Sequence, residues 1–345
     1  MIGVGVIGFG YWGPNLVRNF HEMPDARVLA VSDLRMERLS LAASRYPGIT
    51  VTTHVQELLR SPAVDAVLIA TPVSTHYELA LQALRAGKHV LVEKPLTTTS
   101  EQALRLSEEA DRRGLTLMVD HTFVYTGSVR AMKELLAKGD IGDLYYYDSV
   151  RVNLGLFQHD VNVLWDLAVH DLSIMDHLLP CRPRAVCATG MRHFPKEPEN
   201  IAYLTLFYDS SLIAHIHVNW LAPVKVRRTL IGGSRKMIMY DDVEPSEKVK
   251  VYDKGVMTET QQAGSEAMYK MLVGYRAGDM WAPQLDTAEA LKREARHFLD
   301  CITDRQIPLT GGEAGTRVVQ ILEAASRSMA ERGRLIEVES MRLAA

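Results

Sequence analysis

The first 120 residues alternate short apolar runs with amphipathic stretches, and this alternation constrains the fold more than any other feature of the chain. The apolar runs are rich in Val, Ile and Leu and are bounded by turn residues, as buried strands are; they cover residues 2–7, 28–31, 64–70, 89–92 and 115–119. Between them we expect helices near residues 14–23, 34–46, 55–61, 74–86 and 100–113. Strands that alternate with helices are joined by right-handed crossovers into a parallel sheet. The pattern therefore predicts an α/β, doubly wound domain over residues 1–120.

The pattern changes after about residue 120. Longer alternating segments, separated by turn pairs such as Asp209-Ser210 and Gly232-Gly233, indicate hairpins; they cover residues 143–154, 184–192, 201–208, 211–220, 224–232 and 236–241. We expect helices near residues 128–138, 160–179, 285–303 and 312–332, and a short final strand at 335–338. Residues 121–345 are therefore predicted to form an α+β domain, with an antiparallel or mixed sheet covered by helices on one face.

Composition narrows the class of protein. The 345 residues suggest about two domains, and 47% hydrophobic with 23% charged residues is ordinary for a soluble globular chain. A net charge of −3 offers no basic surplus for nucleic acid or an anionic membrane, and no apolar run approaches the roughly 18 residues of a membrane span. Three cysteines without CxxC spacing favour a reducing compartment. Because no charge precedes Arg18, the first residues lack the positive region of a secretory signal, and we expect a cytoplasmic protein.

A glycine-rich turn directly follows the first predicted strand. Residues 8–13 read G-F-G-Y-W-G, which is the spacing G-x-G-x-x-G, and they open the first helix. Gly8 permits a tight turn, Gly10 lets the backbone approach a pyrophosphate, and Gly13 lets the helix pack closely on the strand. Free N–H groups at the helix start then face the anion. In this position the turn predicts a dinucleotide-binding Rossmann domain.

An acidic residue is expected about 20 positions after this turn, at the end of the second strand. Asp33 stands there; its carboxylate would accept hydrogen bonds from the adenosine ribose and repel a 2′-phosphate, which favours NAD over NADP. Arg35 is a further candidate cofactor contact, and its presence leaves NADP as an alternative cofactor. Tyr11 and Trp12, inside the turn, are also candidate cofactor contacts. The alternative is a plain glycine turn with a surface Asp after the next strand.

The tripeptide Glu93-Lys94-Pro95 follows the predicted strand at 89–92. Ligands of parallel sheets bind at the carboxyl ends of the strands, so Lys94 would face the nicotinamide end of the cofactor, with Glu93 and Pro95 as neighbouring contacts. A partly desolvated lysine can share a proton at neutral pH. Pro95 restrains Lys94 to an extended backbone, which would fix the direction of its side chain. The alternative is a salt-bridged lysine at a strand end.

A carboxylate and a histidine occur four residues apart in the helix predicted at 160–179. Asp166 and His170 would share a helix face. Histidine has the right unperturbed pKa to accept a hydroxyl proton, and a nearby carboxylate can orient it. The alternatives are an ordinary surface pair or two ligands of a metal site. Further ligands at suitable spacing are missing, so no metal is expected.

Other polar residues follow strand ends or lie at the domain junction. Thr71 and Pro72 follow the strand at 64–70, and His76 begins the next helix, so these three are candidate cofactor contacts. His121 and Tyr125 lie at the junction of the two predicted domains, where clefts form, and are candidate substrate contacts.

These pieces occur in a fixed order: the glycine turn, Asp33, Ala70-Thr71-Pro72, Glu93-Lys94-Pro95, and then Asp166 with His170. In this order the chain resembles the glucose–fructose oxidoreductase/inositol dehydrogenase (Gfo/Idh/MocA) family over nearly its whole length. The resemblance implies a Rossmann domain followed by a domain with an open-faced, mostly antiparallel sheet used in homodimer or homotetramer contacts. It also implies that Lys94 and His170 are the catalytic pair and that Asp166 lines the substrate site.

Two further segments resemble a bacterial branch of that family associated with nucleotide sugars: residues 10–15 (G-Y-W-G-P-N) and residues 219–228, in which Lys225 is a candidate substrate contact. The resemblance implies an NAD-dependent interconversion of a sugar hydroxyl and ketone, similar to a UDP-N-acetylglucosamine 3-dehydrogenase. The alternatives are a myo-inositol-type dehydrogenase, a glycoside hydrolase without net redox, and a non-enzymatic NAD sensor. Many relatives carry a small residue where this chain has Asp120, which we expect to reshape the pocket entrance. Specificity is expected to depend on loops near 151–160 and 254–284.

Overall fold

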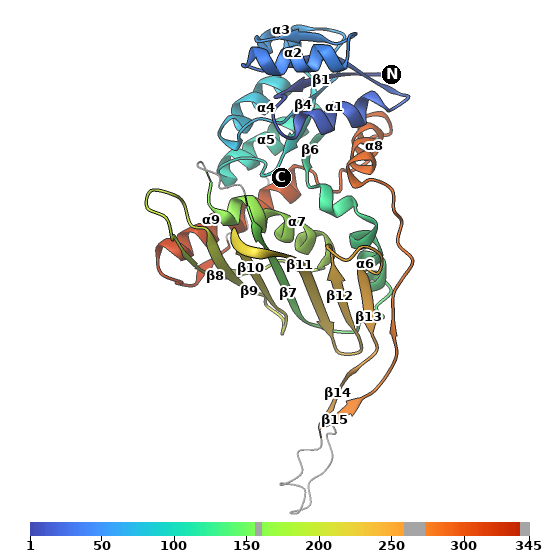
Figure 1. The fold of residues 1–345 in the computed structure, drawn as a ribbon, viewed down its shortest axis with the longest axis vertical. Helices are drawn as coiled ribbons and strands as arrows, with labels where there is room; N and C mark the ends of the chain where they lie inside the picture. Colours follow the sequence, from blue (N-terminus) through green and yellow to red (C-terminus); the bar gives the residue numbers. More distant parts are fainter. Residues whose placement is uncertain (156–160, 259–272, 339–345) are drawn as a thin grey trace, which may run out of the picture.

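The computed structural model describes residues 1–155, 161–258 and 273–338 and builds them around two sheets (Figure 1). The loop residues 156–160 and 259–272, on which part of the specificity prediction falls, lie outside the described residues. The first sheet is parallel and the second mostly antiparallel, so the predicted fold class is confirmed. The division of the chain at residue 120 separates the two sheets.

The N-terminal sheet, which lies within residues 1–155, has six strands in the order β3-β2-β1-β4-β5-β6. This is the doubly wound order in which the strand sequence reverses next to β1. Sequence reasoning missed β3, which is only three residues long and follows a helix without an apolar run. The strands are β1 (Ile2–Ile7), β2 (Ala26–Ser32), β3 (Thr50–Thr52), β4 (Ala66–Ile69), β5 (His89–Glu93) and β6 (Leu117–Asp120).

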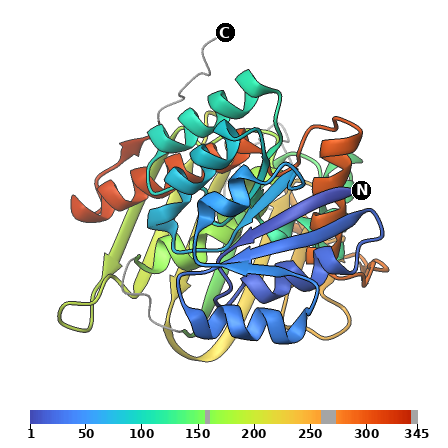
Figure 2. The same ribbon diagram turned by 90° about the horizontal axis from the view of Figure 1, so that it is seen from above.

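Helices cover both faces of this sheet (Figure 2). Apolar residues of α1 (Gly13–His21) and α2 (Met36–Arg45) join one buried cluster, and those of α3 (Val55–Arg60), α4 (His76–Arg85) and α5 (Ser100–Arg113) join the other. Because both faces are buried, the strands are apolar almost throughout, which explains why short continuous apolar runs predicted them.

Within the described part of the chain, the second sheet has nine strands in the order β16-β13-β12-β11-β7-β10-β9-β8-β17. All neighbours are antiparallel except β10 and β7. The central strands are long, and alternate residues along them are buried. The strands are β7 (Leu144–Leu154), β8 (Ala185–Met191), β9 (Ile201–Phe207), β10 (Ile213–Asn219), β11 (Leu221–Gly233), β12 (Met237–Asp241), β13 (Val249–Tyr252), β16 (Met280–Trp281) and β17 (Ile336–Glu337).

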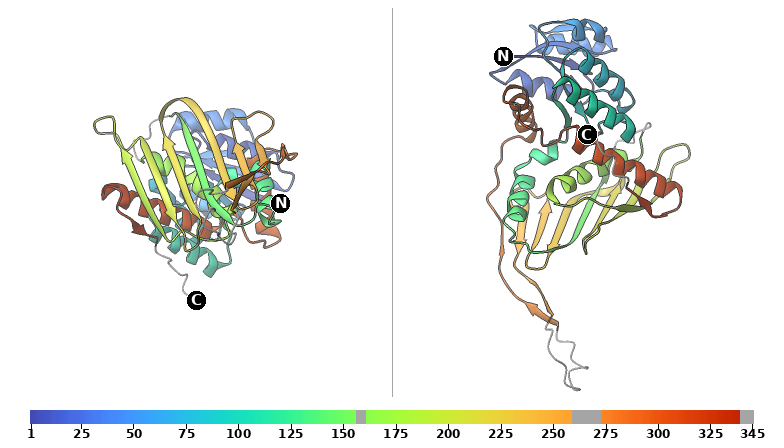
Figure 3. Two further views of the ribbon diagram at one scale, coloured as in Figure 1. Left: turned by 90° about the horizontal axis from the view of Figure 1, so that it is seen from below. Right: turned by 180° about the vertical axis from the view of Figure 1, so that it is seen from behind.

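One face of the second sheet packs against helices and the other face is open (Figure 3). The covering helices are α6 (Gly127–Ala137), α7 (Val169–Leu178) and α9 (Gly312–Ala330). Side chains such as Tyr203 and Phe207 remain exposed on β9. A separate two-stranded ribbon, β14 (Gly255–Thr258) with β15 (Val273–Arg276), projects beyond the sheet (Figure 1).

A helix from the C-terminal half packs on the N-terminal sheet. The buried face of α8 (Ala290–Thr303) joins the same apolar cluster as α1, and the ring of Phe298 meets that of Phe20 edge-on at 6.1 Å between centroids. The sequence predicted a helix near residues 285–303, but it gave no indication of which sheet that helix would pack against. Consequently α8 brings residues from late in the sequence beside the glycine turn and the end of β6.

Candidate active site

The register of the parallel strands brings the predicted cofactor residues to one edge. Ile7 of β1 aligns with Ser32 of β2 and Ile69 of β4, so the residues that follow these three strand ends emerge side by side. Ligands of doubly wound sheets bind at this carboxyl edge, where the strand order reverses. The structure therefore brings the glycine turn, Asp33 and Thr71 together, as the sequence predicted.

The glycine turn has the conformation that a pyrophosphate cradle requires. Gly8 has a φ of +94°, and a Cβ there would lie 2.3 Å from the carbonyl oxygen of Ala70. A Cβ on Gly13 would lie 2.1 Å from the carbonyl oxygen of Gly8, so the turn can close only with glycine. At Gly10 a Cβ would meet only the Arg35 guanidinium, at 3.4 Å, so backbone N–H groups stay accessible there. With no acidic residue in the first turn of α1, this geometry fits the pyrophosphate of a dinucleotide.

Asp33 directly follows β2, at the carboxyl edge of the sheet. Its Oδ2 accepts a 2.7 Å hydrogen bond from the Phe9 N–H, which ties the end of β2 to the glycine turn. Its Oδ1 accepts from the backbone N–H (2.9 Å) and the Nε (3.1 Å) of Arg35. Burial would raise the pKa of Asp33, but the hydrogen bonds from Arg35 and Phe9 hold it below its ordinary value. Asp33 is therefore a carboxylate at neutral pH, and Arg35 lies close enough to influence the choice between NAD and NADP.

Two other predicted cofactor residues differ in accessibility. The Tyr11 side chain is exposed at the tip of the turn, where a bound dinucleotide can reach it. The Trp12 Nε1 instead donates a 2.5 Å hydrogen bond to Asp120 Oδ2 at the end of β6. Asp120 is 2% exposed, so it anchors the glycine turn from inside the fold rather than reshaping a pocket entrance as predicted.

His76 connects two strand ends. Its Nδ1 lies 2.9 Å from the carbonyl oxygen of Pro95 and its Nε2 lies 2.8 Å from that of Thr71, and the residue is 1% exposed. Burial lowers the pKa of His76 despite these two acceptors. Because backbone carbonyls occupy both ring nitrogens, we assign His76 a positioning role between the segments after β4 and β5, in place of the predicted direct cofactor contact.

Three carboxyl groups meet behind the edge of the sheet; those of Asp120 and Glu294 are buried, whereas Glu93 is partly exposed. Glu93 and Asp120 are register partners on the parallel strands β5 and β6, which places them side by side. Glu294 of α8 completes the group; it is fully buried, with Asp120 and Thr122 next to its carboxyl group. Burial, and then the neighbouring Asp120, raise the pKa values of both Glu93 and Glu294 well above the ordinary range. These groups therefore retain protons at pH values where exposed glutamates ionise.

Lys94 reaches across from the first sheet to the second half of the chain. Its Nζ donates to the backbone oxygen (3.0 Å) and to Oδ1 (3.2 Å) of Asp166. The other carboxylate oxygen of Asp166 accepts from Nε1 of the buried Trp220 at 3.0 Å. A lysine has three N–H donors, and the described residues accept from two of them, so one can donate to a substrate oxygen. The Lys94 ammonium group is thus held in a defined position, and one of its N–H donors has no partner among the described residues.

The helix that carries Asp166 and His170 is irregular. Leu164–Ala168 form a π-helical turn, and α7 begins only at Val169, where the sequence predicted one continuous helix. Such turns occur frequently at functional sites because they redirect side chains. Asp166 consequently points its carboxylate at Lys94 and Trp220, and the expected orienting contact with His170 is replaced by these two bonds.

His170 is surrounded by positive charge. Burial, followed by the charges of Lys94 and Arg151, holds the pKa of His170 well below its ordinary value. Its Nδ1 is buried without a hydrogen-bond partner among the described residues. The imidazole is therefore neutral at physiological pH and can accept a proton.

The predicted substrate contacts have different outcomes. His121 is buried near Lys94; burial and that charge lower the pKa of His121 to about 3, and in the described ranges neither ring nitrogen has a partner. The hydroxyl of Tyr125 instead lies in the core, 3.0 Å from Thr310 Oγ1. Lys225 is exposed, on the part of β11 where the register with β7 shifts. The buried hydroxyl of Tyr125 contradicts its predicted substrate contact, whereas His121 and Lys225 remain candidate contacts.

Three residues near His170 were missed by sequence reasoning. The ring of Phe123 meets the His170 ring edge-on at 5.0 Å between centroids, and the guanidinium carbons of Arg151 and Arg227 lie 4.5 and 5.7 Å from the Phe123 centroid. The sequence gives only a weak indication of the two arginines, because each one interrupts an otherwise ordinary strand pattern. Only the register between β7 and β11 reveals that they are neighbours.

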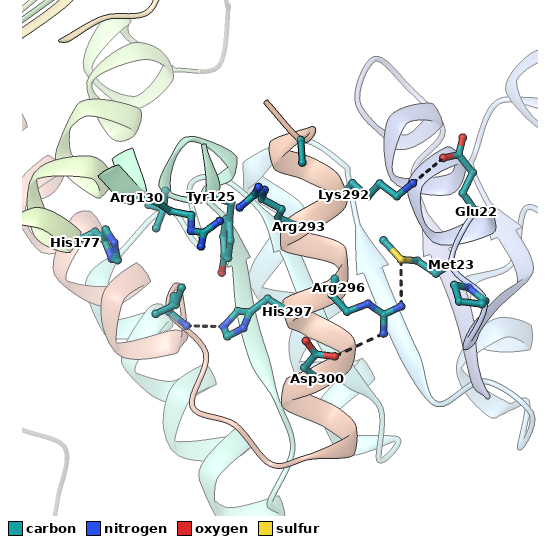
Figure 4. Close-up of a pocket in the computed structure, with 14 residues that line it drawn as sticks. Glu22, Met23, Tyr125, Arg130, His177, Lys292, Arg293, Arg296, His297 and Asp300 are labelled. Atoms are coloured by element: carbon teal, nitrogen blue, oxygen red, sulfur yellow. Dashed lines mark hydrogen bonds and ion pairs between the residues drawn. The ribbon is translucent and has the colours of Figure 1, made fainter. Parts of the chain in front are cut away.

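A cavity of about 550 Å³ lies away from this site, beside α8 (Figure 4). The cations at its wall are paired with acids: Arg296 with Asp25 at 2.5 Å and Lys292 with Glu22 at 3.8 Å. It contains none of Lys94, Asp166 and His170. In the described ranges no three His, Cys, Asp or Glu side chains are grouped to hold a metal ion, and no helix there combines the length and apolar character of a membrane span.

Comparison with known proteins supports the reading of the fold. The chain is 25% identical to the scyllo-inositol 2-dehydrogenase (NADP(+)) IolW of Bacillus subtilis, over 96% of this chain and 94% of that protein. Its fold is similar to that of GenD2 from gentamicin A biosynthesis in complex with NAD (TM-score 0.82, 24% identity, 98% and 97% coverage). It is also similar to that of the UDP-N-acetylglucosamine 3-dehydrogenase GnnA from Acidithiobacillus ferrooxidans (TM-score 0.79, 24% identity, 95% and 98% coverage).

Two family models match consecutive parts of the chain. The model described as "Oxidoreductase family, NAD-binding Rossmann fold" matches residues 2–121, and the "GFO/IDH/MocA C-terminal domain" matches residues 129–239. Together they span well over half of the sequence, in the order that the glycine turn and the lysine–histidine pair predicted. The chain therefore belongs to the Gfo/Idh/MocA family of NAD-binding oxidoreductases.

Proposed function

We propose that this oxidoreductase interconverts a ring hydroxyl and a ketone on a sugar, and that the sugar is carried on a nucleotide. The observation that supports the chemistry most directly is the arrangement of Lys94, which is fixed by Asp166 and keeps one free donor, beside the neutral imidazole of His170. Lys94 and His170 are then the catalytic residues, and Asp166 positions Lys94.

The roles follow from this geometry. Bound NAD supplies the acceptor for the hydride that leaves the carbinol carbon, and Gly8, Gly10, Gly13 and Asp33 would hold it. His170 accepts the hydroxyl proton, so that the C–H and O–H bonds break as the C=O bond forms. Lys94 donates a hydrogen bond to the same oxygen and stabilises the negative charge that develops there.

A nucleotide sugar is favoured by the arginines near His170, which suit phosphate oxygens, and by the likeness in fold to a UDP-N-acetylglucosamine 3-dehydrogenase. A polyol is the second candidate, because a relative that aligns with nearly the whole chain is named a scyllo-inositol dehydrogenase. The open face of the second sheet, with apolar side chains exposed on it, supports assembly into a homodimer or homotetramer.

The test is NADH formation, followed by its absorbance, with UDP-sugars, dTDP-sugars, inositols and free hexoses. We expect a nucleotide sugar to give the highest kcat/KM. A preference for inositols would reject the nucleotide-sugar assignment, and sugar release without net NADH would reject net redox chemistry. Lys94→Met and His170→Asn should each lower kcat roughly 100-fold or more while NAD still binds. The exposed Lys138→Met and His54→Asn are matched controls, and normal turnover in both site variants would refute the catalytic pair.

A further inference from the structure

Two arginines stand side by side on the strands nearest His170. Arg151 of β7 and Arg227 of β11 are register partners in the antiparallel pairing of these strands. Like charges directly opposite each other destabilise a sheet. The pair therefore lowers the stability of the fold unless negatively charged groups neutralise it. Both guanidinium groups also contact the Phe123 ring, whose edge-on neighbour is His170.

Acidic residues of the chain compensate this pair only in part. The Nε of Arg151 donates to Asp171 at 2.6 Å, and the Nη1 of Arg227 donates to Asp242 at 3.3 Å. Nevertheless the Nη1 of Arg151 and the Nε of Arg227 are buried without a hydrogen-bond partner among the residues that the structure describes. Buried donors of charged groups are expensive to leave unpaired. The site therefore offers charge-assisted donors for an acceptor that the described chain does not provide.

We propose that the substrate carries an anionic oxygen group, a carboxylate or a phosphate, that binds Arg227 while a hydroxyl of the same molecule reacts at Lys94 and His170. This rests on the proposed oxidoreductase function and assigns the anionic group of its substrate to a specific contact residue, Arg227. Arg227 is the contact residue because its side chain is 26% exposed, whereas the Arg151 side chain, at 3%, is held against Asp171 and reinforces the positive field. Arg227 is then a specificity-determining residue that selects against neutral polyols.

The same positive charges act on His170, the proposed proton acceptor. Burial is the largest cause that lowers the pKa of His170, and the charges of Lys94, Arg151 and Arg227 act in the same direction, as His121 would if it were protonated. Asp166 and Asp171 face the same cluster through their bonds to Lys94 and Arg151. An anion bound at Arg227 would offset part of the positive field, so that the correct substrate itself makes His170 a better proton acceptor.

The experiment compares four probes that share a glucopyranosyl ring: D-glucose, D-glucuronate, glucose 1-phosphate and UDP-glucose. For the wild type we expect at least one anionic probe to exceed D-glucose in kcat/KM, with glucuronate identifying a carboxylate site and the other two a phosphate site. Arg227→Gln should lower kcat/KM for that anion roughly 10- to 100-fold and change the value for D-glucose little. Arg228→Gln is the matched control, since Arg228 is exposed and paired with Asp241.

Two further measurements separate a specific role from a structural one. Removing the charge of Arg227 should raise the pKa of His170, so the acidic limb of the kcat/KM profile should move to higher pH. If no probe reduces NAD, the proposed function is decided by the wider panel of sugars and inositols given above, and the inference is tested separately by titration calorimetry of the three anionic probes with the NAD-loaded protein; weaker binding to Arg227→Gln supports it. Equal losses for neutral and anionic probes, or equal affinity of wild type and Arg227→Gln, would overturn it.

Discussion

The buried carboxyl of Glu294 allows a prediction about stability and pH. In the folded chain this group is fully buried beside Asp120, and burial, Asp120 and Glu93 raise its pKa, whereas in the unfolded chain it has the ordinary glutamate pKa of about 4.3. Folding therefore takes up a proton at any pH between those two values. Stability then falls as the pH rises through this window, by about 1.4 kcal/mol per pH unit for one proton.

Glu294→Gln removes this proton uptake and preserves the size of the side chain. We expect the variant to gain stability over the wild type as the pH rises from 5.5 to 7.5, at about 1.4 kcal/mol per pH unit while Glu294 stays protonated in the folded chain. The free energy of unfolding is measured in urea by tryptophan fluorescence at several pH values. Gln can also donate a hydrogen bond to Asp120, which Glu294 can do only when it is protonated.

The control lies at the start of the same helix. Glu289 precedes α8, its side chain is 43% exposed, and a hydrogen bond from Arg18 lowers its pKa, so Glu289→Gln should give no gain that grows with pH. If Glu294→Gln and the wild type keep a constant stability difference from pH 5.5 to 7.5, then Glu294 ionises normally in the folded chain and the reasoning is wrong.

Other predictions concern the cofactor edge. Asp33→Asn should weaken NAD binding roughly 10- to 100-fold and, because it releases Arg35 from its ion pair, should raise the NADP/NAD ratio of kcat/KM; an unchanged ratio would show that Asp33 does not read the ribose. His76→Ala should raise KM for NAD several-fold with a smaller change in kcat, because the segments after β4 and β5 lose their common contact. A variant with normal KM and reduced kcat would contradict this positioning role.

Sequence reasoning was most successful where structure depends on local backbone geometry. A pyrophosphate turn needs glycine at fixed spacing after a strand, and Gly8, Gly13 and Asp33 therefore could be located by position alone. The parallel sheet followed from the period of apolar residues, since strands buried on both faces are apolar throughout. Lys94 and His170 emerged from the order of short motifs, although nothing local could place them together.

What only the tertiary structure decided involves residues far apart in the chain. Glu294 meets Asp120 because α8 returns to the first sheet, and Arg151 faces Arg227 because of the register between β7 and β11. The π-helical turn places Asp166 within hydrogen-bond distance of Lys94. The local sequence predicted a regular helix here, so this turn depends on the packing around it. Spacing along a chain encodes backbone conformation, which is local. The contacts of side chains depend on how elements dock, and docking is decided by the burial of whole faces.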